Sequence, residues 1–455
     1  MKVGVVILAA GQGTRMRSDI PKVLHPLAGK PLLGHVIDTA QALRPARVCV
    51  VYGHGGESVI QGLAGCDVCW VEQADQQGTG HAALQALPAV ADLDRLLILY
   101  GDIPLIRRET LQALLQCADA TDLALLTVTL EDPSGYGRIL RDEHGQVRRI
   151  VEQRDAAAAE LGIKEINTGI MVVDRARLSQ WLSRLGNDNA QGEYYLTDVI
   201  ELAAHDAIDI ATVQPASIEE VAGVNDRAQL AVLERFYQRQ QAEHLMRSGV
   251  TLADPARFDL RGVLRHGRDV FLDVNVVLEG EVQLGRGVRV GPNCVLRDCA
   301  IGAGTQVFAN SVIEQAKVGE GARIGPFSRI RPEADLADQV HIGNFVEIKK
   351  SRVGVGSKIN HLSYVGDTDV GAGVNIGAGT ITCNYDGAHK YRTVIGDEAF
   401  IGSDTQLVAP VTIGSGATIG AGSTITHDAP SGQLTLSRTR QFTVEGWVRP
   451  RKDLK

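Results

Sequence analysis

The chain has 455 residues, of which 44% are hydrophobic and 22% charged, and its formal net charge at pH 7 is −8. This length is sufficient for two or three domains. The negative charge argues against a nucleic-acid-binding protein, and no apolar run approaches the length of a membrane span. Because the seven Cys are odd in number, we expect free thiols, a reducing compartment and a cytoplasmic protein.

The first half alternates apolar strands with helical segments. We predict a helix at 32–43 and strands at 3–9, 47–52, 96–100, 123–130 and 170–173. Unbroken apolar strands between helices predict a mostly parallel sheet in a Rossmann-like α/β domain. Ligands of such sheets bind beyond the carboxyl ends of the strands.

A Gly-rich turn follows the first strand. Gly11 and Gly13 come directly after Leu8-Ala9-Ala10, and the cations Arg15 and Lys22 lie close behind. The turn lacks the third Gly of a dinucleotide fingerprint and the Lys-Ser/Thr of a Walker loop. Backbone N–H groups in such a turn can face a phosphate, although a plain strand-to-helix turn with surface cations is the alternative.

A carboxylate ends the strand at 96–100. Tyr100 and Gly101 precede Asp102, which the strand presents at its carboxyl edge. Mg²⁺ prefers one or two protein oxygens together with substrate phosphates, so Asp102 is a candidate metal ligand. An ordinary loop Asp is the alternative.

A long amphipathic helix is expected at 226–246, with Asp226 as its N-cap and Ser248-Gly249 as its stop. It separates the two halves as a stiff spacer. We therefore expect a first domain at 1–226, a linker helix at 227–247 and a second domain at 248–455.

The second half repeats an apolar, mostly β-branched residue every six positions, with one-residue slips, and Gly often follows it. The repeat includes Ile301, Val307, Ile313, Val318, Ile324, Ile330, Leu336, Ile342, Ile348, Val353, Ile359, Val365, Val370, Ile376, Ile395, Ile401, Leu407, Ile413, Ile419 and Ile425. A period of six fits neither an amphipathic helix nor an alternating strand. It predicts a parallel β-helix of hexapeptide repeats with the branched side chains inside.

The repeat is interrupted at 383–393 by a loop rich in Asn, Tyr, His, Lys and Arg. Insertions in solenoids form surface loops, often on the binding face, although a tolerated excursion is the simpler explanation. His361 lies nearby on the rod, and histidine is the residue type best suited to act as a general base near neutral pH. We therefore expect a polar site on the rod wall.

Several motifs together carry a family resemblance. The turn at 8–16 with Pro21-Lys22 resembles the signature of sugar-phosphate nucleotidyltransferases. The rod segment 375–379, leading into Cys383-Asn384-Tyr385-Asp386-Gly387, resembles the acetyltransferase half of the bifunctional N-acetylglucosamine-1-phosphate uridyltransferase/glucosamine-1-phosphate acetyltransferases. The resemblance covers the whole chain. The supporting motifs are Gln73, Gly78-Thr79-Gly80-His81, Tyr100-Gly101-Asp102, Gly135-Tyr136-Gly137-Arg138, Val151-Glu152-Gln153 and Glu165-Ile166-Asn167-Thr168-Gly169.

The resemblance implies two reactions in series. Glucosamine 1-phosphate would be acetylated by acetyl-CoA, and the product would react with UTP, with Mg²⁺, to give UDP-N-acetylglucosamine and pyrophosphate. This product feeds peptidoglycan and lipopolysaccharide precursors. The family's rods are left-handed and form homotrimers.

The resemblance also assigns roles to residues. Arg15 and Lys22 would hold the triphosphate, Asp102 and Asn225 would bind Mg²⁺, and helix capping is the alternative for Asn225. His361 would be the catalytic base, with Glu347 as a tentative partner for its ring. The uridylyl site would comprise Leu8, Ala9, Ala10, Gly11, Lys22, Gln73, Gly78, Thr79, Tyr100, Gly101, Asp102, Gly137, Glu152, Asn167 and Asn225. Within it the resemblance places Gln73, Gly78 and Thr79 near the uracil base, and Gly137, Glu152 and Asn167 at the sugar and ribose. The acetyl site would comprise Arg331, Lys349, Tyr364, Asn375, Asn384 and Tyr385, with acetyl-CoA on Ala378, Ser403, Ala421 and Arg438.

One alternative function stays open at this point. A sugar-phosphate nucleotidyltransferase with a single activity can carry a β-helix that only oligomerises. A purely structural rod has no reason to carry His361, Tyr364 and Asn384 together.

Overall fold

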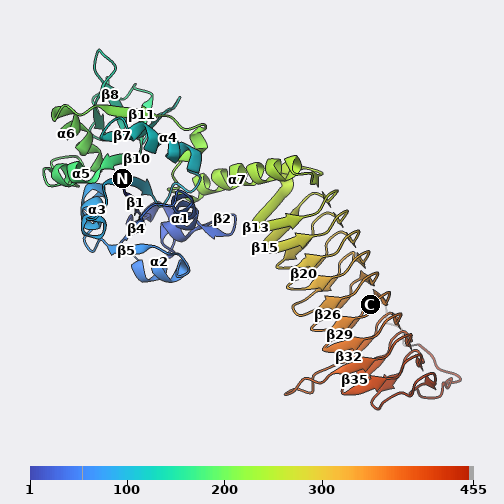
Figure 1. Ribbon diagram of the computed structural model, residues 1–455. Coiled ribbons are helices and arrows are strands. Elements are labelled where there is room, and N and C mark those ends of the chain that lie inside the picture. The colour runs from blue at the N-terminus through green and yellow to red at the C-terminus, as the bar shows by residue number, and fades with distance from the viewer. Residues whose placement is uncertain (54, 450–455) are drawn as a thin grey trace, which may run out of the picture. The chain divides into compact units, whose positions relative to one another are not determined.

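The computed structural model describes residues 1–53 and 55–449, which fall into two compact units, Met1–Tyr237 and Gln238–Lys455 (Figure 1). Each unit has its own core of buried hydrophobic side chains. No helix in the described part of the chain is long and apolar enough to cross a membrane.

The first unit is built on a mostly parallel sheet with the strand order β11-β7-β10-β6-β1-β4-β5. β1 pairs in parallel with β4 and β6, whereas β10 runs antiparallel to β6 and β7. The strands are β1 (Val3–Leu8), β4 (Arg47–Tyr52), β5 (Cys69–Glu72), β6 (Arg95–Tyr100), β7 (Leu123–Thr129), β10 (Glu165–Asp174) and β11 (Ile210–Val213), with a small ribbon of β8 (Arg138–Arg141) and β9 (Val147–Val151). The predicted α/β class and the predicted strands are confirmed.

Helices cover both faces of this sheet, which is why its strands are apolar without interruption. Val5 and Ile7 of β1 share one core with α1 and α4, and Val6 and Leu8 share the other with α3, α5 and α6. The helices are α1 (Leu32–Ala42), α2 (Gly56–Gly62), α3 (Thr79–Ala86), α4 (Arg108–Ala118), α5 (Arg175–Leu182) and α6 (Val199–His205).

The predicted long helix is α7 (Arg227–Arg247), within one residue of the expected bounds. Asp226 Oδ1 accepts a hydrogen bond from Gln229 N at 2.8 Å, which satisfies a free N–H of the first turn. Leu233 is buried in the first unit, and Leu245 is buried in the core of the second.

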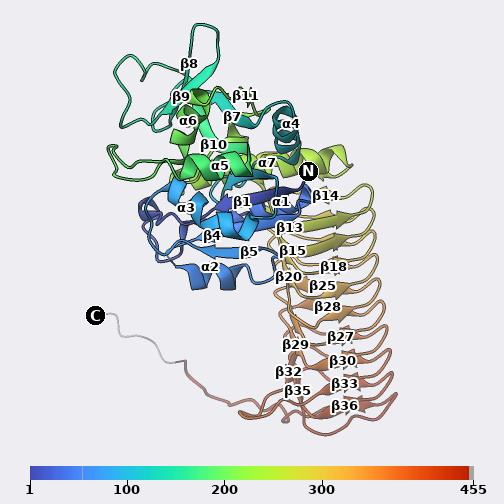
Figure 2. The ribbon, with the colours of Figure 1, turned by 60° about the vertical axis from the view of Figure 1, so that its left-hand side comes forward.

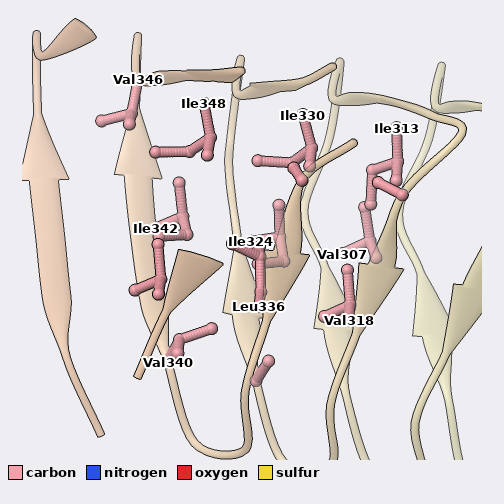
Figure 3. Close-up of a cluster of buried hydrophobic side chains, with 14 of the residues drawn as sticks. Val307, Ile313, Val318, Ile324, Ile330, Leu336, Val340, Ile342, Val346 and Ile348 are labelled. Atoms are coloured by element: carbon pink, nitrogen blue, oxygen red, sulfur yellow. The ribbon is translucent and has the colours of Figure 1, made fainter. Parts of the chain in front are cut away.

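The second unit is a parallel β-helix, whose stacked coils are visible in Figure 2. One sheet has 11 strands, from β12 (Thr251–Leu252) to β39 (Leu434–Thr435), and the other has 17, from β13 (Phe258–His266) to β38 (Thr424–Ile425). Every predicted repeat position is at most 4% exposed, and Figure 3 shows those between Val307 and Ile348 in stacked rows. The expected inward face of the hexapeptide repeat is therefore confirmed.

The site discussed below uses six strands of this rod. They are β25 (His341–Asn344), β26 (Glu347–Lys349), β28 (Lys358–His361), β29 (Tyr364–Gly366), β31 (Asn375–Ile376) and β32 (Ile381–Cys383).

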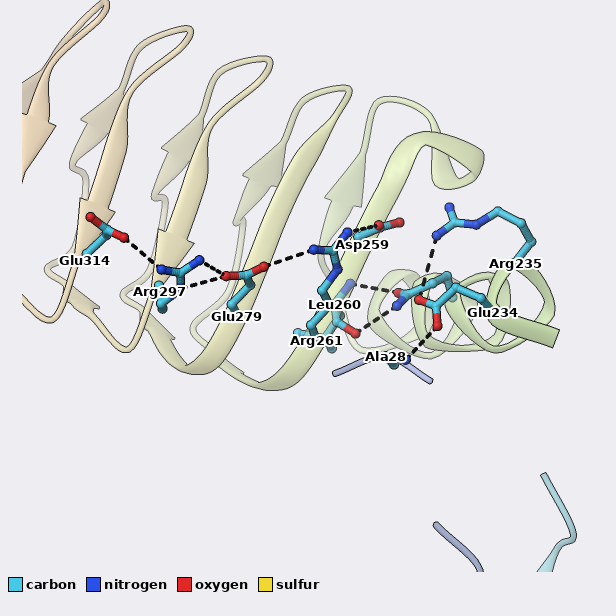
Figure 4. A network of polar contacts seen from close by, with 10 residues as sticks. Ala28, Glu234, Arg235, Asp259, Leu260, Arg261, Glu279, Arg297 and Glu314 are labelled. Atoms are coloured by element: carbon cyan, nitrogen blue, oxygen red, sulfur yellow. Dashed lines mark hydrogen bonds and ion pairs between the residues drawn. The ribbon is translucent and has the colours of Figure 1, made fainter. Parts of the chain in front are cut away.

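The outer surface of the first coils is tied by a ladder of ion pairs (Figure 4). Arg261 Nη1 lies 3.0 Å from Glu279 Oε1, and Arg297 Nε donates to Glu279 Oε2 at 2.6 Å. Arg297 Nη1 also donates to Glu314 Oε1 at 2.9 Å. Because these charges form a network across neighbouring coils, they contribute more than isolated surface pairs.

Candidate active sites

The first unit contains a cavity of about 500 Å³ at the carboxyl ends of β1, β5 and β6. This is where a parallel sheet of this kind binds ligands. Ten residues named from the sequence line it: Leu8, Ala9, Ala10, Gly11, Lys22, Gln73, Gly78, Thr79, Tyr100 and Asp102. The cavity therefore unites the Gly-rich turn, Lys22 and the predicted metal ligand Asp102.

The Gly-rich turn is packed directly against the segment that carries Lys22. Gly13 has a φ of +62°, and a Cβ added to it would lie 2.5 Å from Lys22 Cβ. A side chain at position 13 would therefore strain the backbone and push Lys22 away. This explains the need for Gly at position 13 and places the ammonium group at the turn.

The two basic side chains expected to bind phosphate each form a hydrogen bond with one of the two expected metal ligands. Lys22 Nζ donates to Asp102 Oδ2 at 2.5 Å, and Arg15 Nη2 donates to Asn225 Oδ1 at 2.9 Å. The Asn225 side chain thus faces Arg15, and the cap of α7 is Asp226. These contacts favour a role of Asn225 in the uridylyl site over a role as the cap of α7.

The residues expected near the base lie between the end of β5 and the start of α3. Gln73 is 3% exposed, and its Nε2 donates to Gly78 O at 3.1 Å. Thr79 Oγ1 accepts from Leu196 N at 3.0 Å. Burial, and next the charge of Glu152, raise the pKa of the Tyr100 hydroxyl, so this group stays protonated.

The expected sugar-binding residues come from three neighbouring segments. Asn167 N donates to Gly137 O at 2.9 Å, and a Cβ on Gly137 would lie 3.3 Å from Glu152 Oε1. Thr197 Oγ1 donates to the same oxygen of Glu152 at 3.1 Å. Burial raises the pKa of Glu152, while the bond from Thr197 lowers it.

The cavity of the first unit is also lined by residues that were not predicted from the sequence to belong to the uridylyl site. Gln12, Gly13, Thr14, Val23, Gln76, Ala82 and Glu193 also line the cavity. Gln12 and Gln76 lie between residues that were named, so their position in the motifs was a usable signal. Glu193 had none, because its segment reaches the cavity through tertiary contacts, such as the hydrogen bond from Tyr194 N to Gln77 O at 2.8 Å.

The acetyl-site residues of the rod lie along one corner and the two sheets beside it. Asn344 and His361 are in register on β25 and β28, and His361 O accepts from Gly379 N at 3.3 Å. Ala378 O accepts from Asp404 N at 2.7 Å, and Ser403 O from Gly422 N at 2.8 Å. His361 and the expected CoA residues Ala378, Ser403 and Ala421 therefore belong to one column, one residue per coil.

The imidazole of His361 is held by an amide and not by the carboxylate that we expected. His361 Nδ1 lies 2.9 Å from Asn344 Oδ1. Glu347 Oε1 instead accepts from Arg331 Nη1 at 2.6 Å. The assignment of Glu347 as the partner of His361 is therefore wrong, because the ring contacts Asn344 and the carboxylate of Glu347 contacts the guanidinium of Arg331.

Asn384 is fixed by a residue that the sequence analysis did not name. Its Nδ2 donates to Asp367 Oδ2 at 2.5 Å and lies 3.4 Å from Tyr364 Oη. Asp367 and Asn384 are both 7% exposed. Tyr364 and Lys349 belong to the 17-stranded sheet, and Asn384 directly follows its strand β32, whereas Asn375 belongs to the 11-stranded sheet on the other side of the corner.

Two expected residues lie at the edges of this surface. Tyr385 is 59% exposed at the base of the inserted loop, where it bridges to Lys390. Arg438 Nη2 lies 3.6 Å from the position of a Cβ on Gly420, so its side chain covers the strand end that carries Ala421.

Beside His361, one corner of the rod carries a stripe of exposed apolar side chains, Phe327, Phe345 and Leu362, whose backbone has positive φ. Asn275, Asn293 and Asn310 occupy the left-handed corner position of the early coils and are joined by side-chain hydrogen bonds of 2.9 and 3.2 Å. In the next three coils this position holds Phe327, Phe345 and Leu362, with φ of 54°, 56° and 49° and exposed fractions of 50%, 55% and 62%. The rings of Phe327 and Phe345 stack at 5.4 Å.

Comparison with known families divides the chain at similar places. Residues 5–248 match the MobA-like NTP transferase domain, and residues 392–427 match the bacterial transferase hexapeptide (six repeats). Residues 267–353 match the GMPPB C-terminal domain.

Curated relatives named bifunctional protein GlmU match from end to end. The relative from Azoarcus sp. (strain BH72) is 60% identical over 448 residues, which are 98% of this chain and 99% of that protein. Relatives from Methylococcus capsulatus and Ralstonia nicotianae are 59% and 58% identical over 453 residues, covering at least 98% of both chains. The chain therefore belongs to the family of bifunctional GlmU proteins.

Proposed function

We propose that this protein makes UDP-N-acetylglucosamine by acetylating glucosamine 1-phosphate and then transferring a uridylyl group to the product. It is a bifunctional transferase that uses glucosamine 1-phosphate, acetyl-CoA and UTP. The observation that carries this conclusion is the presence of two polar sites in one chain. One is the cavity around Lys22 and Asp102, and the other is the corner around His361.

The uridylyl step needs alignment and charge neutralisation. A phosphate oxygen of N-acetylglucosamine 1-phosphate attacks the α-phosphorus of UTP, and the bond to pyrophosphate breaks. This oxygen is ionised at neutral pH, so no general base is required. Arg15 and Lys22 neutralise the triphosphate and the departing pyrophosphate. Glu152 accepts a hydrogen bond from a sugar hydroxyl.

Asp102 and Asn225 are the residues proposed to hold Mg²⁺. A carboxylate and an amide oxygen match the oxygen ligands that Mg²⁺ takes together with substrate phosphates. Among the described residues no group of three or more His, Cys, Asp or Glu forms a metal site. The metal ion supplies positive charge beside the triphosphate. Without nucleotide, Lys22 and Arg15 form hydrogen bonds with the side-chain oxygens of Asp102 and Asn225. When the nucleotide binds, its phosphates attract the two basic side chains and free these oxygens for the metal.

The acetyl step needs a base. The amino group of glucosamine 1-phosphate must lose a proton to attack the thioester carbonyl of acetyl-CoA, and CoA leaves as the thiolate. His361 takes the proton. Arg331 and Lys349 bind the sugar phosphate, Tyr364, Asn375, Asn384 and Tyr385 bind the sugar, and Ala378, Ser403, Ala421 and Arg438 bind acetyl-CoA.

The acetyl site is completed by further copies of the chain, in a homotrimer. Asn375 and Tyr364 lie on different sheets flanking a corner of the rod, so the other walls of the site come from a second copy. Bulky residues at positive φ cost on the order of 1–3 kcal/mol each, and the exposed stripe Phe327, Phe345 and Leu362 recovers this cost only when it is covered. Leu362 of the stripe directly follows His361, which supports an interface beside the proposed base.

We also place the enzyme in the cytoplasm, and we keep the domain bounds 1–226, 227–247 and 248–455 as proposals. All seven cysteines are free, which fits a reducing compartment.

One assay tests the two activities. Purified protein receives Mg²⁺, glucosamine 1-phosphate, acetyl-CoA and UTP, and free CoA thiol and pyrophosphate are followed separately. Release of both, with pyrophosphate lagging behind CoA, supports the sequence of reactions. Pyrophosphate that forms only from supplied N-acetylglucosamine 1-phosphate, without CoA, would make the rod a purely structural domain.

A further inference from the structure

A side-chain amide lies in register with the proposed base on the adjacent coil. Asn344 ends β25 and His361 ends β28, and the parallel pairing places them opposite each other. Asn344 Oδ1 lies 2.9 Å from His361 Nδ1. In the described ranges, 1–53 and 55–449, the second ring nitrogen, Nε2, has no hydrogen-bond partner.

This contact selects one tautomer of the imidazole. A neutral imidazole has one N–H and one nitrogen lone pair, and a carbonyl oxygen can only accept. Nδ1 therefore carries the hydrogen, and the lone pair is on Nε2. Nε2 is then the nitrogen that can take a proton from the attacking amine.

We propose that Asn344 is a positioning residue for acetyl transfer, which holds His361 in the tautomer and orientation that make Nε2 the base. This inference rests on the proposed role of His361. The contact at Nδ1 comes from this amide, whereas the carboxylate of Glu347 contacts Arg331 at 2.6 Å. An amide orients the ring without adding a negative charge that would stabilise the imidazolium.

Two substitutions of Asn344 separate orientation from packing. Asn344→Leu keeps the approximate shape of the side chain and removes the acceptor oxygen, whereas Asn344→Asp keeps an acceptor oxygen at the same place. Asn344 O accepts from Leu362 N at 3.1 Å through the backbone, so both variants keep this bond between coils.

The test measures kcat and KM for acetyl transfer in the full-length protein, with uridylyl transfer in the same sample as the control for enzyme concentration and thermal unfolding of the rod as the control for folding. We expect Asn344→Leu to lower kcat at least 10-fold, but less than the roughly 10²–10⁴-fold lost with a general base. KM for glucosamine 1-phosphate should stay the same, and Asn344→Asp should recover most of kcat.

Two outcomes would overturn the inference. If Asn344→Leu keeps the wild-type kcat, or if Asn344→Asp is as impaired as Asn344→Leu, the acceptor oxygen has no positioning role. His361→Ala is measured in parallel. If His361→Ala retains acetyl transfer, the proposed base itself is wrong, and this failure is distinct from that of Asn344.

Discussion

The two sites of this protein are built in opposite ways. The uridylyl site is a cavity within one unit, where strand ends and loops converge and Lys22 and Asp102 are paired at 2.5 Å. The acetyl site is an exposed corner of a rod whose inward side chains are all used by the core. A sheet with helices on both faces can enclose a ligand at its strand ends. A solenoid has only its outward positions for chemistry, so its site stays open until another surface covers it.

The largest effect that separates the two sites is expected from His361→Ala. Removing the base should slow acetyl transfer roughly 10²–10⁴-fold. Uridylyl transfer from supplied N-acetylglucosamine 1-phosphate should keep its wild-type rate, since that site belongs to the other unit. The two rates are measured as CoA thiol and pyrophosphate release. Acetyl transfer within a few-fold of wild type would refute the assignment of the base.

Lys22→Gln should do the reverse. Loss of this cation from the triphosphate should slow uridylyl transfer roughly 100-fold and leave acetyl transfer intact. Because Asp102 loses its ion-pair partner, Mn²⁺ used as a probe should bind more tightly in the absence of nucleotide. Electron paramagnetic resonance measures this as a smaller fraction of free Mn²⁺.

The matched control for this prediction is Lys30→Gln, at an exposed ion pair with Asp38. It should change neither rate nor Mn²⁺ binding. Unchanged Mn²⁺ affinity in Lys22→Gln would show that the pair with Asp102 does not compete with the metal.

Phe345→Asn should weaken the proposed trimer. Asn suits the left-handed backbone and occupies the same corner position in earlier coils, so the rod should fold as before. Sedimentation equilibrium should show dissociation at protein concentrations where the wild type stays associated. Acetyl transfer should then depend on protein concentration, while uridylyl transfer should not.

The control for the stripe is Val232→Asn, which removes another exposed apolar side chain, 66% exposed on α7. It should leave the association unchanged. An equal loss of association in both variants would mean that the stripe is not a specific interface.

The smallest effect concerns the pH dependence of stability in the first unit. Burial first, and then the charges of Glu201, Glu152 and Asp155, raise the pKa of Asp198 to about 6. Since the native state holds this proton more tightly than the unfolded chain, the free energy of unfolding falls as pH rises from about 4 to about 6.

Asp198→Asn should remove this fall. The free energy of unfolding of the variant, minus that of the wild type, should be on the order of 1 kcal/mol larger at pH 7 than at pH 4. The partial exposure of the carboxyl group keeps this difference small. Urea unfolding at the two pH values measures it. Equal stabilities of variant and wild type at both pH values would contradict the shift.

Much of the architecture was readable from residue patterns. The helix expected at 226–246 is Arg227–Arg247, and the six-residue repeat identified the inward side chains from Ile301 to Ile425. Asp102 was found because polar residues after apolar strands gather at one edge of a parallel sheet, and Lys22 because it follows the Gly-rich turn. The contacts between side chains were harder to predict, as Glu347 demonstrates.

Asn344 was missed although a signal for it exists. Three full hexads would place each residue 18 positions after its neighbour on the preceding coil, as with Arg261 and Glu279. The slip between Ile348 and Val353 shortens this coil, so Asn344 and His361 are 17 positions apart. Counting the slip would have found the pair.

The sequence by itself determined which side chains are buried in the rod and which chemistry-bearing residues follow the strands, because both depend on local periodicity. The tertiary structure alone decided which groups meet: Lys22 with Asp102, Arg15 with Asn225, Thr197 with Glu152 and Asp367 with Asn384. The reason is geometric. A hydrogen bond depends on distance and direction to within a fraction of an ångström, and these are set by the packing of segments that local pattern does not connect.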